Sequence, residues 1–406
     1  CGVGISMRVH YFDSSQYGAP TLNATMGSLI ALLDACLVNG FGTLEVVSLR
    51  ISENTATVET SQPHLFKDGQ YLSIQGANEA ELNGDFPVRV LGANLFSYPV
   101  YGATTAEGTG TITVKRPGAN WEKVFSGLNE AVYRSKEGIR PFLHVIDNAS
   151  TGAGTREASW RGYRDMESLT AGFTEPFPTP AQRPTGIMVY KTGSANALPQ
   201  PWILIADSRA FYLMCQVDSA NNNTRLPTGA SWPMWHAFGE LAHPFMEVDP
   251  YCCFIAGNAN ANAIGDNHQD NGVFYPSSRK NSGESGSSAW LMRGIAGTPD
   301  APVQYANMGH CWDENAIGEA ACFAYPHRTD NGMMITPIRA VSEGALRGYM
   351  PGFYESMHGD ITGSVPFGSI IDGEFIGMEG RKFIVVTGRR YTSVGAAFFD
   401  ITGPWR

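Results

Sequence analysis

The stretch Leu44–Glu59 reads LEVVSLRISENTATVE and contains two successive runs in which apolar and polar residues alternate. A period of two places every second side chain on the same face of a β-strand, so each run predicts a strand with one buried face. Further short strands follow, with the turn dipeptides Asp68-Gly69 and Asn83-Gly84 between them. They are expected at Gln70–Ile74, Phe86–Val90, Asn94–Tyr98 and Gly108–Val114. We therefore predict that residues 43–116 form a small β-sandwich or barrel module.

Residues 1–42 precede this module and predict a strand followed by a helix. Met7–Phe12 reads MRVHYF and is strand-like, and a helix is expected over Thr25–Val38 because apolar residues recur there at helical spacing. These apolar residues are Met26, Leu29, Ile30, Leu33 and Leu37. Asn39-Gly40 is a good stop signal for the helix. Its apolar stripe must pack on a later part of the chain or on a neighbouring subunit.

Residues 117–406 predict a large β-rich domain with long polar loops. An amphipathic helix is expected at Trp121–Arg134, where Val124, Leu128 and Val132 share one face. Strands are expected at Phe142–Ile146, Ile187–Lys191, Trp202–Ala206, Phe211–Val217, Phe383–Thr387 and Ala397–Ile401. Gly257–Gly272 and Ser277–Ser288 are polar and without periodicity, which is typical of exposed loops. The fold class predicted for the whole chain is mainly β with minor α.

The composition excludes some classes of protein and favours others. The chain of 406 residues has 28 Lys and Arg against 38 Asp and Glu, a net charge of −10, which argues against direct nucleic-acid binding. Charged residues make up only 16%, against a usual ~25%, which suits a subunit whose surface is covered by neighbours. No stretch approaches the ~20 apolar residues of a membrane span. The opening CGVGIS lacks the basic start and apolar core of a secretory signal.

The common catalytic motifs are absent from the sequence. There is no Gly-x-x-x-x-Gly-Lys-Ser/Thr phosphate loop, no strand-turn-helix Gly-x-Gly-x-x-Gly and no His-Glu-x-x-His. Gly283–Ser287 reads GESGS and misses the Gly-x-Ser-x-Gly pattern of serine hydrolases, and it lies in a polar loop.

Three weaker constellations each have a simpler structural interpretation. His310-Cys311-Trp312-Asp313 places a base beside a thiol, but adjacent strand residues point to opposite faces. Asp266, His268 and Asp270 alternate in an Asn-rich loop and Gly272 follows, but the glycine is misplaced for an EF-hand, so a solvated loop is favoured over a calcium site. His236 and His243 could share a helical face and bind a metal, and a packed aromatic region is the favoured alternative.

Pairs of carboxylates for glycoside cleavage are candidates only by residue type, because their separation in space is not visible in the sequence. They are Asp313-Glu314 and Asp372 with Glu374. The eight Trp and 16 Tyr could line a sugar groove, but most are expected to be core or interface residues. We therefore expect no catalytic residues, no cofactor and no metal site.

The seven cysteines include no C-x-x-C pair, which excludes zinc-ribbon and thioredoxin sites. They are Cys1, Cys36, Cys215, Cys252, Cys253, Cys311 and Cys322. Cys36 is expected in the core of the N-terminal helix. The vicinal pair Cys252-Cys253 and the pair Cys311 and Cys322 are either buried thiols, which we favour, or disulfides formed under oxidising conditions.

Several stretches resemble a family of tailed-bacteriophage virion proteins. Those outside the module are Gly18–Leu22, Gly27–Gly42, Arg161–Met166, Phe177–Thr179, Ser194–Ala197, Trp202–Leu213 and Phe399–Arg406. Within the module, Pro63-His64, Gly69, Ile74–Gly76, Leu82–Phe86 and Phe96–Tyr98 resemble a small β-domain found in phage structural proteins. Residues 218–336 match nothing in this family.

The resemblance implies a non-enzymatic structural subunit of the virion, in the tail, baseplate or neck/collar, that is assembled in the bacterial cytoplasm. Its expected partners are other phage structural proteins and further copies of itself, and the subunit contacts are expected at Thr25–Val38 and in the module. The alternative is an exposed capsid decoration or a host-binding adhesin whose long loops contact the host surface. A glycan hydrolase is the third hypothesis.

Overall fold

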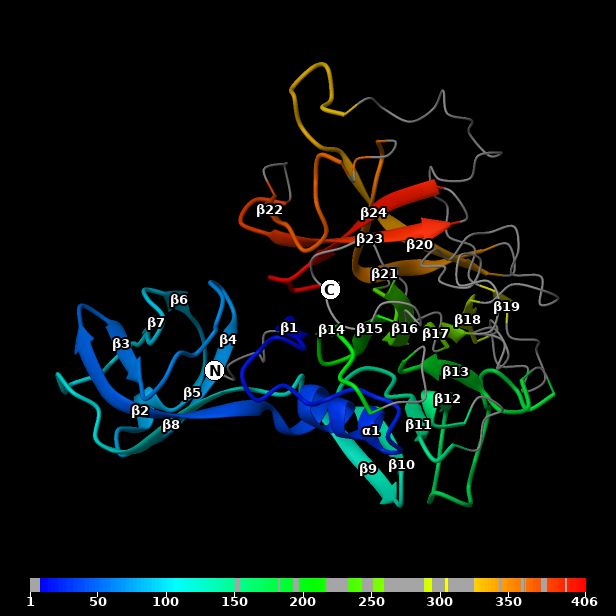
Figure 1. Cartoon of the computed structure of the whole chain (residues 1–406), viewed down its shortest axis with the longest axis horizontal. Coiled ribbons are helices and arrows are strands. Elements are labelled where there is room, and N and C mark those ends of the chain that lie inside the picture. Colours follow the sequence, from blue (N-terminus) through cyan, green and yellow to red (C-terminus); the bar gives the residue numbers. More distant parts are fainter. Residues whose placement is uncertain are drawn as a thin grey trace.

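The computed structural model is mainly β with one short N-terminal α-helix, as the sequence predicts (Figure 1). Its strands form sheets of seven, twelve and five strands. The structure describes residues 8–149, 154–181, 183–192, 197–216, 233–242, 251–258, 288–293, 304–305, 325–342, 345–358, 361, 363–373, 378–390 and 393–406. Among these residues, no helix has the length and apolar character needed to cross a membrane.

The seven-stranded sheet, which we call the module, covers residues 41–116. It consists of β2 (Phe41–Ser52), β3 (Thr55–Thr60), β4 (Tyr71–Ala77), η2 (Ala80–Leu82), β5 (Gly84–Pro87), β6 (Arg89–Val90), β7 (Leu95–Pro99) and β8 (Gly110–Arg116), in the strand order β5-β4-β8-β2-β3-β7-β6. Strand β2 pairs with β8 as far as Glu45 and with β3 from Val46 onward, with a bulge between Val46 and Ser48. The sheet therefore folds around its own core, in which the alternate residues Ala56 and Val58 of β3 are fully buried.

The twelve-stranded sheet contains most of the large segment. Its strands are β1 (His10–Asp13), β9 (Trp121–Gly127), β10 (Glu130–Ser135), β11 (Phe142–Ile146), β12 (Glu157–Tyr163), β13 (Ile187–Tyr190), β14 (Trp202–Ala206), β15 (Ala210–Gln216), β16 (Pro233–Glu240), β17 (Cys253–Asn258), β18 (Ser288–Met292) and β19 (Gln304–Tyr305), with η3 (Gly154–Arg156) before β12. The antiparallel order is β1-β14-β15-β16-β17-β13-β12-β11-β10-β9, and β18 pairs with β17 and β19. The Trp121 ring contacts that of Phe211, 5.6 Å between centroids, although β9 and β15 are far apart in this order. The sheet is therefore strongly curved.

The N-terminal helix fills the inside of this curved sheet. It runs as α1 (Ser28–Leu33) and continues as the π-helical turn η1 (Asp34–Asn39). Leu29, Leu33 and Leu37 are all 0% exposed and belong to the same core as the inner face of the sheet. This part of the predicted stripe is therefore covered by the chain itself, one of the two coverings expected, and the subunit contact expected at Thr25–Val38 stays a prediction.

A buried ion pair holds the start of α1 in place. The carboxylate of Asp147 accepts the backbone N–H of Leu29 at 3.0 Å and lies 2.5 Å from the Lys191 ammonium, with both charged side chains fully buried. Lys191 also donates to the carbonyl of Thr25 at 2.8 Å. Burial raises the pKa of Asp147 and lowers that of Lys191, and each charge opposes the shift of the other.

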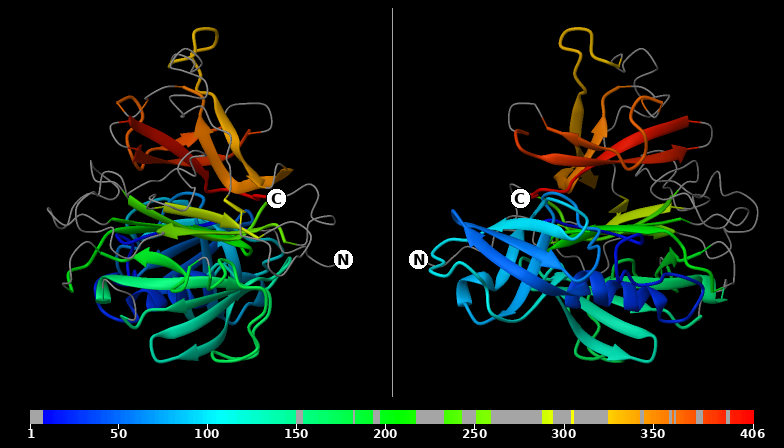
Figure 2. Two further views of the ribbon diagram at one scale, coloured as in Figure 1. Left: turned by 90° about the vertical axis from the view of Figure 1, so that its right-hand side faces the viewer. Right: turned by 60° about the vertical axis from the view of Figure 1, so that its left-hand side comes forward.

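The five-stranded sheet is C-terminal and packs on the other side of the large sheet (Figures 1 and 2). Its strands are β20 (Ile335–Ser342), β21 (Ala345–Ser356), β22 (Ile370–Asp372), β23 (Lys382–Arg390) and β24 (Ser393–Asp400), in the order β20-β21-β24-β23-β22. Aromatic rings join the two sheets: Tyr212 of β15 lies 5.0 Å from Phe399, and Trp235 of β16 lies 5.1 Å from the same ring. The strands β14–β17 are thus covered on both faces.

Some predicted elements differ from those observed. The predicted helix over Trp121–Arg134 is instead the hairpin β9–β10, with Asn129 at φ 55° in its turn. Val124, Leu128 and Val132 recur every four residues, and a spacing of four fits one face of a strand as well as one face of a helix. Leu128 is 89% exposed at the turn. The helix expected from Thr25 begins at Ser28, and the first strand is His10–Asp13.

The six strands predicted for the large segment are all present, with bounds that differ by up to four residues. Strands β12 and β16–β22 were not predicted. Of the two predicted loops, Gly257 and Asn258 belong to β17 and Ser288 begins β18, while the residues between them lie outside the described part. The division into segments at residues 42 and 116 stays a prediction.

We expect Lys191→Met to destabilise the fold by about 3 kcal/mol, because it leaves the Asp147 carboxylate buried without its counter-charge. Urea denaturation at neutral pH measures this loss. The control is Lys382→Met, which breaks an exposed pair with Asp372 (3.3 Å) and should cost less than about 1 kcal/mol. Equal losses in the two variants would contradict the role of the buried pair.

Candidate functional sites

His236, which the sequence suggested as a metal ligand, lies in the core. It lies on β16, not on a helix, is fully buried and accepts the backbone N–H of Tyr190 at its Nε2, 3.2 Å away. Its ring meets that of Trp160 at 5.9 Å, and burial lowers the pKa of His236 to about 3. His243 lies outside the described residues. In the described part, no three His, Cys, Asp or Glu side chains gather as a metal site would require.

Most other candidates from the sequence cannot be placed. Asp266, His268, Asp270, Gly272, Gly283–Ser287, His310–Asp313, Glu314 and Glu374 lie outside the described residues. Asp372 is on β22, where it pairs with Lys382 at 3.3 Å and its side chain is 71% exposed. That arrangement is an ordinary surface ion pair between neighbouring strands.

The described cysteines are buried. Cys36 packs against the inner face of the large sheet, and burial raises the pKa of both Cys36 and Cys215. Cys252 belongs to the core between the two stacked sheets, whereas Cys253 belongs to the core around the helix. The vicinal cysteines thus point to opposite faces and are not joined to each other. Outside the described residues lie Cys1, Cys311 and Cys322.

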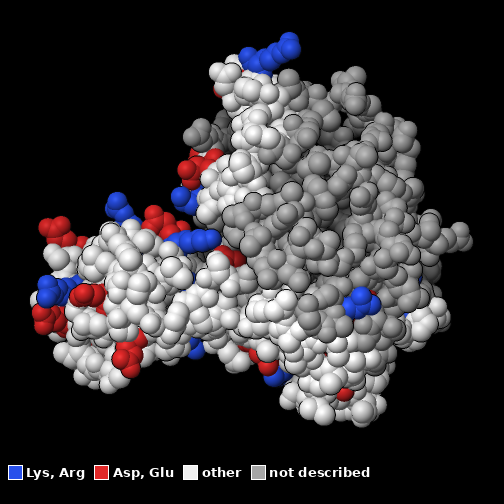
Figure 3. Space-filling view, viewed as in Figure 1, with Lys and Arg blue, Asp and Glu red and all other residues white. Residues whose placement is uncertain are grey.

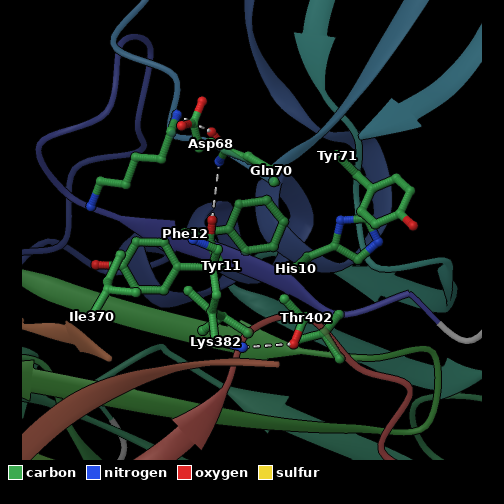
Figure 4. A pocket seen from close by; sticks show the side chains of 13 residues that line it. His10, Tyr11, Phe12, Asp68, Gln70, Tyr71, Ile370, Lys382 and Thr402 are labelled. Carbon is green, nitrogen blue, oxygen red and sulfur yellow. Dashed lines mark hydrogen bonds between the residues drawn. The ribbon is translucent and has the colours of Figure 1, made fainter. Parts of the chain in front are cut away.

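Strand β1 is the place where the three sheets meet. Figure 4 shows Tyr11 of β1 between Gln70 of the module on one side and, on the other, Lys382 of β23 and Thr402, which follows β24. The amide of Gln70 donates to the carbonyl of Tyr11 at 3.3 Å, and the Lys67 ammonium lies 4.6 Å from the centre of the Tyr11 ring. The cavity enclosed here is about 30 Å³, which is too small for a ligand. This junction therefore serves to join the sheets.

Arg116, at the end of β8, links the module to the N-terminal segment. Its guanidinium is fully buried and donates to the carbonyls of Leu65 at 3.0 Å, His64 at 3.4 Å and Tyr17 at 3.4 Å. It lies 4.7 Å from the centre of the Phe66 ring. Within the described part of the chain it has no salt bridge, and burial lowers its pKa to about 10. Recognition of three neutral carbonyls fixes the loop before β4.

The carbonyl that Arg116 holds belongs to a strained, exposed leucine. Leu65 has φ 52°, in the left-handed region that a bulky side chain rarely adopts, and it is 56% exposed. The neighbouring amide of Phe66 donates to Nδ1 of His64 at 3.0 Å, and the rings of these two residues stack at 4.6 Å. The loop is thus held rigidly by buried groups while the leucine side chain points outward.

Two further exposed leucines lie on a segment whose backbone contacts His64. The backbone N–H of Leu91 donates to the carbonyl of Leu95 at 2.8 Å, and His64 Nε2 lies 3.4 Å from that same carbonyl. Leu91 is 48% exposed and Leu95 is 36% exposed. We call Leu65, Leu91 and Leu95 the module patch. On the face seen in Figure 3, charges of both signs are scattered over the module without a single-sign patch.

The sequence analysis missed this site. One signal was available for Arg116: Ile112, Val114 and Arg116 occupy alternate positions of β8 and share its buried face. No sequence signal marks the left-handed conformation of Leu65, which depends on contacts with β8. Comparison with known proteins adds nothing here, since no protein-family model and no curated protein matches the chain.

Glu355 on β21 is a buried carboxyl in the core between the stacked sheets. It lies two residues from Phe353 and opposite Ala397, which both belong to that core, and it is 0% exposed. Neither carboxyl oxygen has a hydrogen-bond partner among the described residues. Burial raises the pKa of Glu355 to about 9, and Arg339 opposes this shift only in part. The side chain is therefore neutral at pH 7.

This raised pKa predicts a pH-dependent stability. The unfolded chain loses the proton of Glu355 above about pH 4.5 while the folded chain retains it, so stability falls as the pH rises toward 9. Glu355→Gln removes this dependence, so we expect the stability of the variant relative to the wild type to be higher at pH 8 than at pH 4 by about 4–5 kcal/mol. Urea denaturation at several pH values measures the difference. Glu59→Gln, at an exposed position of β3, is the control and should leave the pH profile unchanged; a profile unaltered by Glu355→Gln would contradict the assignment.

Proposed function

We propose that this chain is a non-enzymatic structural subunit of a tailed-phage virion, in the tail, baseplate or neck/collar, that acts through contacts between subunits. The observation that carries the proposal is the exposed, strained Leu65 in the module patch. The resemblance of the quoted stretches to phage virion proteins and the low fraction of charged residues support it as well. The proposed partners are further copies of this chain and other virion proteins.

A left-handed leucine costs about 1–2 kcal/mol relative to an ordinary conformation. Its carbonyl is fixed by Arg116, so the fold holds the backbone of Leu65 in this conformation. In the free chain the outward side chain of Leu65 gains little from burial, since it is 56% exposed. A contact with a second subunit explains why a leucine stands where asparagine or glycine would be less strained. Strain that is offset only in a complex is typical of contact sites.

The distribution of exposed apolar side chains supports the same proposal. Among the described residues, thirteen large apolar side chains are exposed, and five of them lie on the module. The module residues are Val47, Leu65, Leu91, Leu95 and Tyr101. Single exposed apolar residues need no explanation, but the three leucines of the module patch lie on two segments whose backbones are joined through His64, and such a grouping indicates an interaction surface. We therefore propose that a subunit contact lies on the module.

We expect Leu65→Asn to separate assembly from folding. Asparagine tolerates the left-handed region, so the free energy of unfolding should be unchanged or higher by roughly 0.5–1 kcal/mol. Self-association should weaken by about tenfold, because one apolar contact of about 1.4 kcal/mol is lost. Sedimentation or light scattering over a concentration series measures association. Leu128→Asn, at an exposed leucine outside the module patch, is the control, and equal effects of the two substitutions on association would contradict the contact.

The position in the particle can be tested with intact virions. We expect the purified chain to form a discrete oligomer by light scattering and an antibody against it to label the tail or the neck in electron micrographs. A monomer with label spread over the capsid would instead favour the alternative, a capsid decoration or host-binding adhesin. Particles that carry no label would overturn the virion assignment.

A further inference from the structure

A polar cavity of about 590 Å³ lies between the module and the large sheet, and it is within the size range of small-molecule sites. One wall comes from β4, β5 and β8 of the module, and the other from the end of η1, residues 117–120 and the start of the large sheet. The β2 and β8 strands connect the two parts beside it (Figure 1). Ligand sites are common at such boundaries between packed units.

The lysines that line this cavity differ from the others in the described part of the chain. Six of the seven lysines are described, and four of them form salt bridges with carboxylates. These four are Lys67, Lys123, Lys191 and Lys382. The remaining two, Lys115 and Lys136, have no carboxylate partner among the described residues, and both line the cavity. Two ammonium groups without counter-charges therefore face one hollow of a protein whose net charge is −10.

Each of these ammonium groups has hydrogen-bonding capacity left. Lys115 donates to the backbone carbonyl of Asn39 at 2.9 Å, and Lys136 donates to the side-chain oxygen of Asn120 at 3.1 Å. A lysine ammonium has three donors, so two remain on each for another acceptor. The neutral oxygens orient the lysines without neutralising them.

Three other ionisable side chains beside the lysines do not cancel this charge. Arg8 and Asp85 form a salt bridge of 2.9 Å across the cavity wall and so compensate each other. His10 also lines the cavity, and burial lowers its pKa to about 4, so it is a neutral polar group at pH 7. The excess charge of the cavity is then that of Lys115 and Lys136.

We propose that this cavity binds a small anion with two or more negative charges, carried by phosphate or carboxylate groups. Lys115 and Lys136 bind the anionic groups, and the polar walls accept the rest of the ligand through hydrogen bonds. Charge is the main source of affinity, because the cavity is open and two ammonium groups without counter-charges line it. Binding therefore weakens as the salt concentration rises.

Titration calorimetry of the full chain at low ionic strength tests the proposal, with pyrophosphate and citrate as separate probes. We expect one-to-one binding of at least one probe, weakened about tenfold by either Lys115→Gln or Lys136→Gln, since each removes a charge-assisted contact. Stronger binding of pyrophosphate would identify a phosphate ligand, and stronger binding of citrate a polycarboxylate. Both results support the site.

Lys382→Gln is the matched control, because it removes the same charge from a lysine that has a carboxylate partner outside the cavity. It should leave the affinity unchanged. Circular dichroism and thermal unfolding check that each variant is folded. The proposal is overturned if neither probe binds the folded wild-type chain, or if the double variant Lys115→Gln/Lys136→Gln binds as tightly as the wild type.

Discussion

The rest of the structure depends on the buried pair of Asp147 and Lys191. A strongly curved sheet leaves an apolar interior that must be filled, and α1 with η1 is the element that fills it. The first helical amides have no partners within the helix, and the Asp147 carboxylate satisfies one of them at Leu29. Lys191 neutralises that carboxylate and binds the chain just before the helix through Thr25. Removal of either charge would leave the other buried without a counter-charge. The pair therefore joins three segments that are distant in the sequence, at the start of α1, at Asp147 and at Lys191.

A second constraint fixes the module against the large sheet. The chain enters the module through β2 and leaves it through β8, so two adjacent strands form the covalent connection. Arg116 at the end of β8 adds hydrogen bonds to the carbonyls of Leu65 and Tyr17, on either side of the boundary. The same guanidinium therefore sets both the orientation of the module and the conformation of the exposed leucine. A contact with another subunit at Leu65 would be transmitted directly to the body of the protein.

The parts of the fold that follow from local periodicity could be predicted from the sequence, and those that depend on distant contacts could not. The alternating run of Thr55–Thr60 and the turn dipeptides predicted strands of the module correctly, because one buried face imposes a period of two. Over Trp121–Arg134 the spacing of four residues fits both a strand and a helix, and the pairing of β9 with β10 decides between them. The apolar stripe of α1 predicted a buried helix face, but it did not predict which part of the molecule covers that face. At the module patch, a hydrogen bond from Arg116, 51 residues away in the sequence, fixes the backbone of Leu65. No local sequence pattern predicts a contact over that separation.

Most of the few lysines in the described part of this chain form ion pairs. Lys67 pairs with Asp13 over 54 residues, Lys123 with Asp34 over 89 and Lys191 with Asp147 over 44, so these side chains join segments that are distant in sequence. Exposed ion pairs contribute little to stability. In a partly or fully buried pair, however, an arrangement that separates the two charges leaves one of them buried without a counter-charge, and that arrangement is destabilised. These lysines therefore favour one arrangement of the segments that they join. Lys115 and Lys136 differ from this pattern, because among the described residues they face a common hollow with only neutral oxygens as partners, and the proposed anion would supply the missing counter-charge.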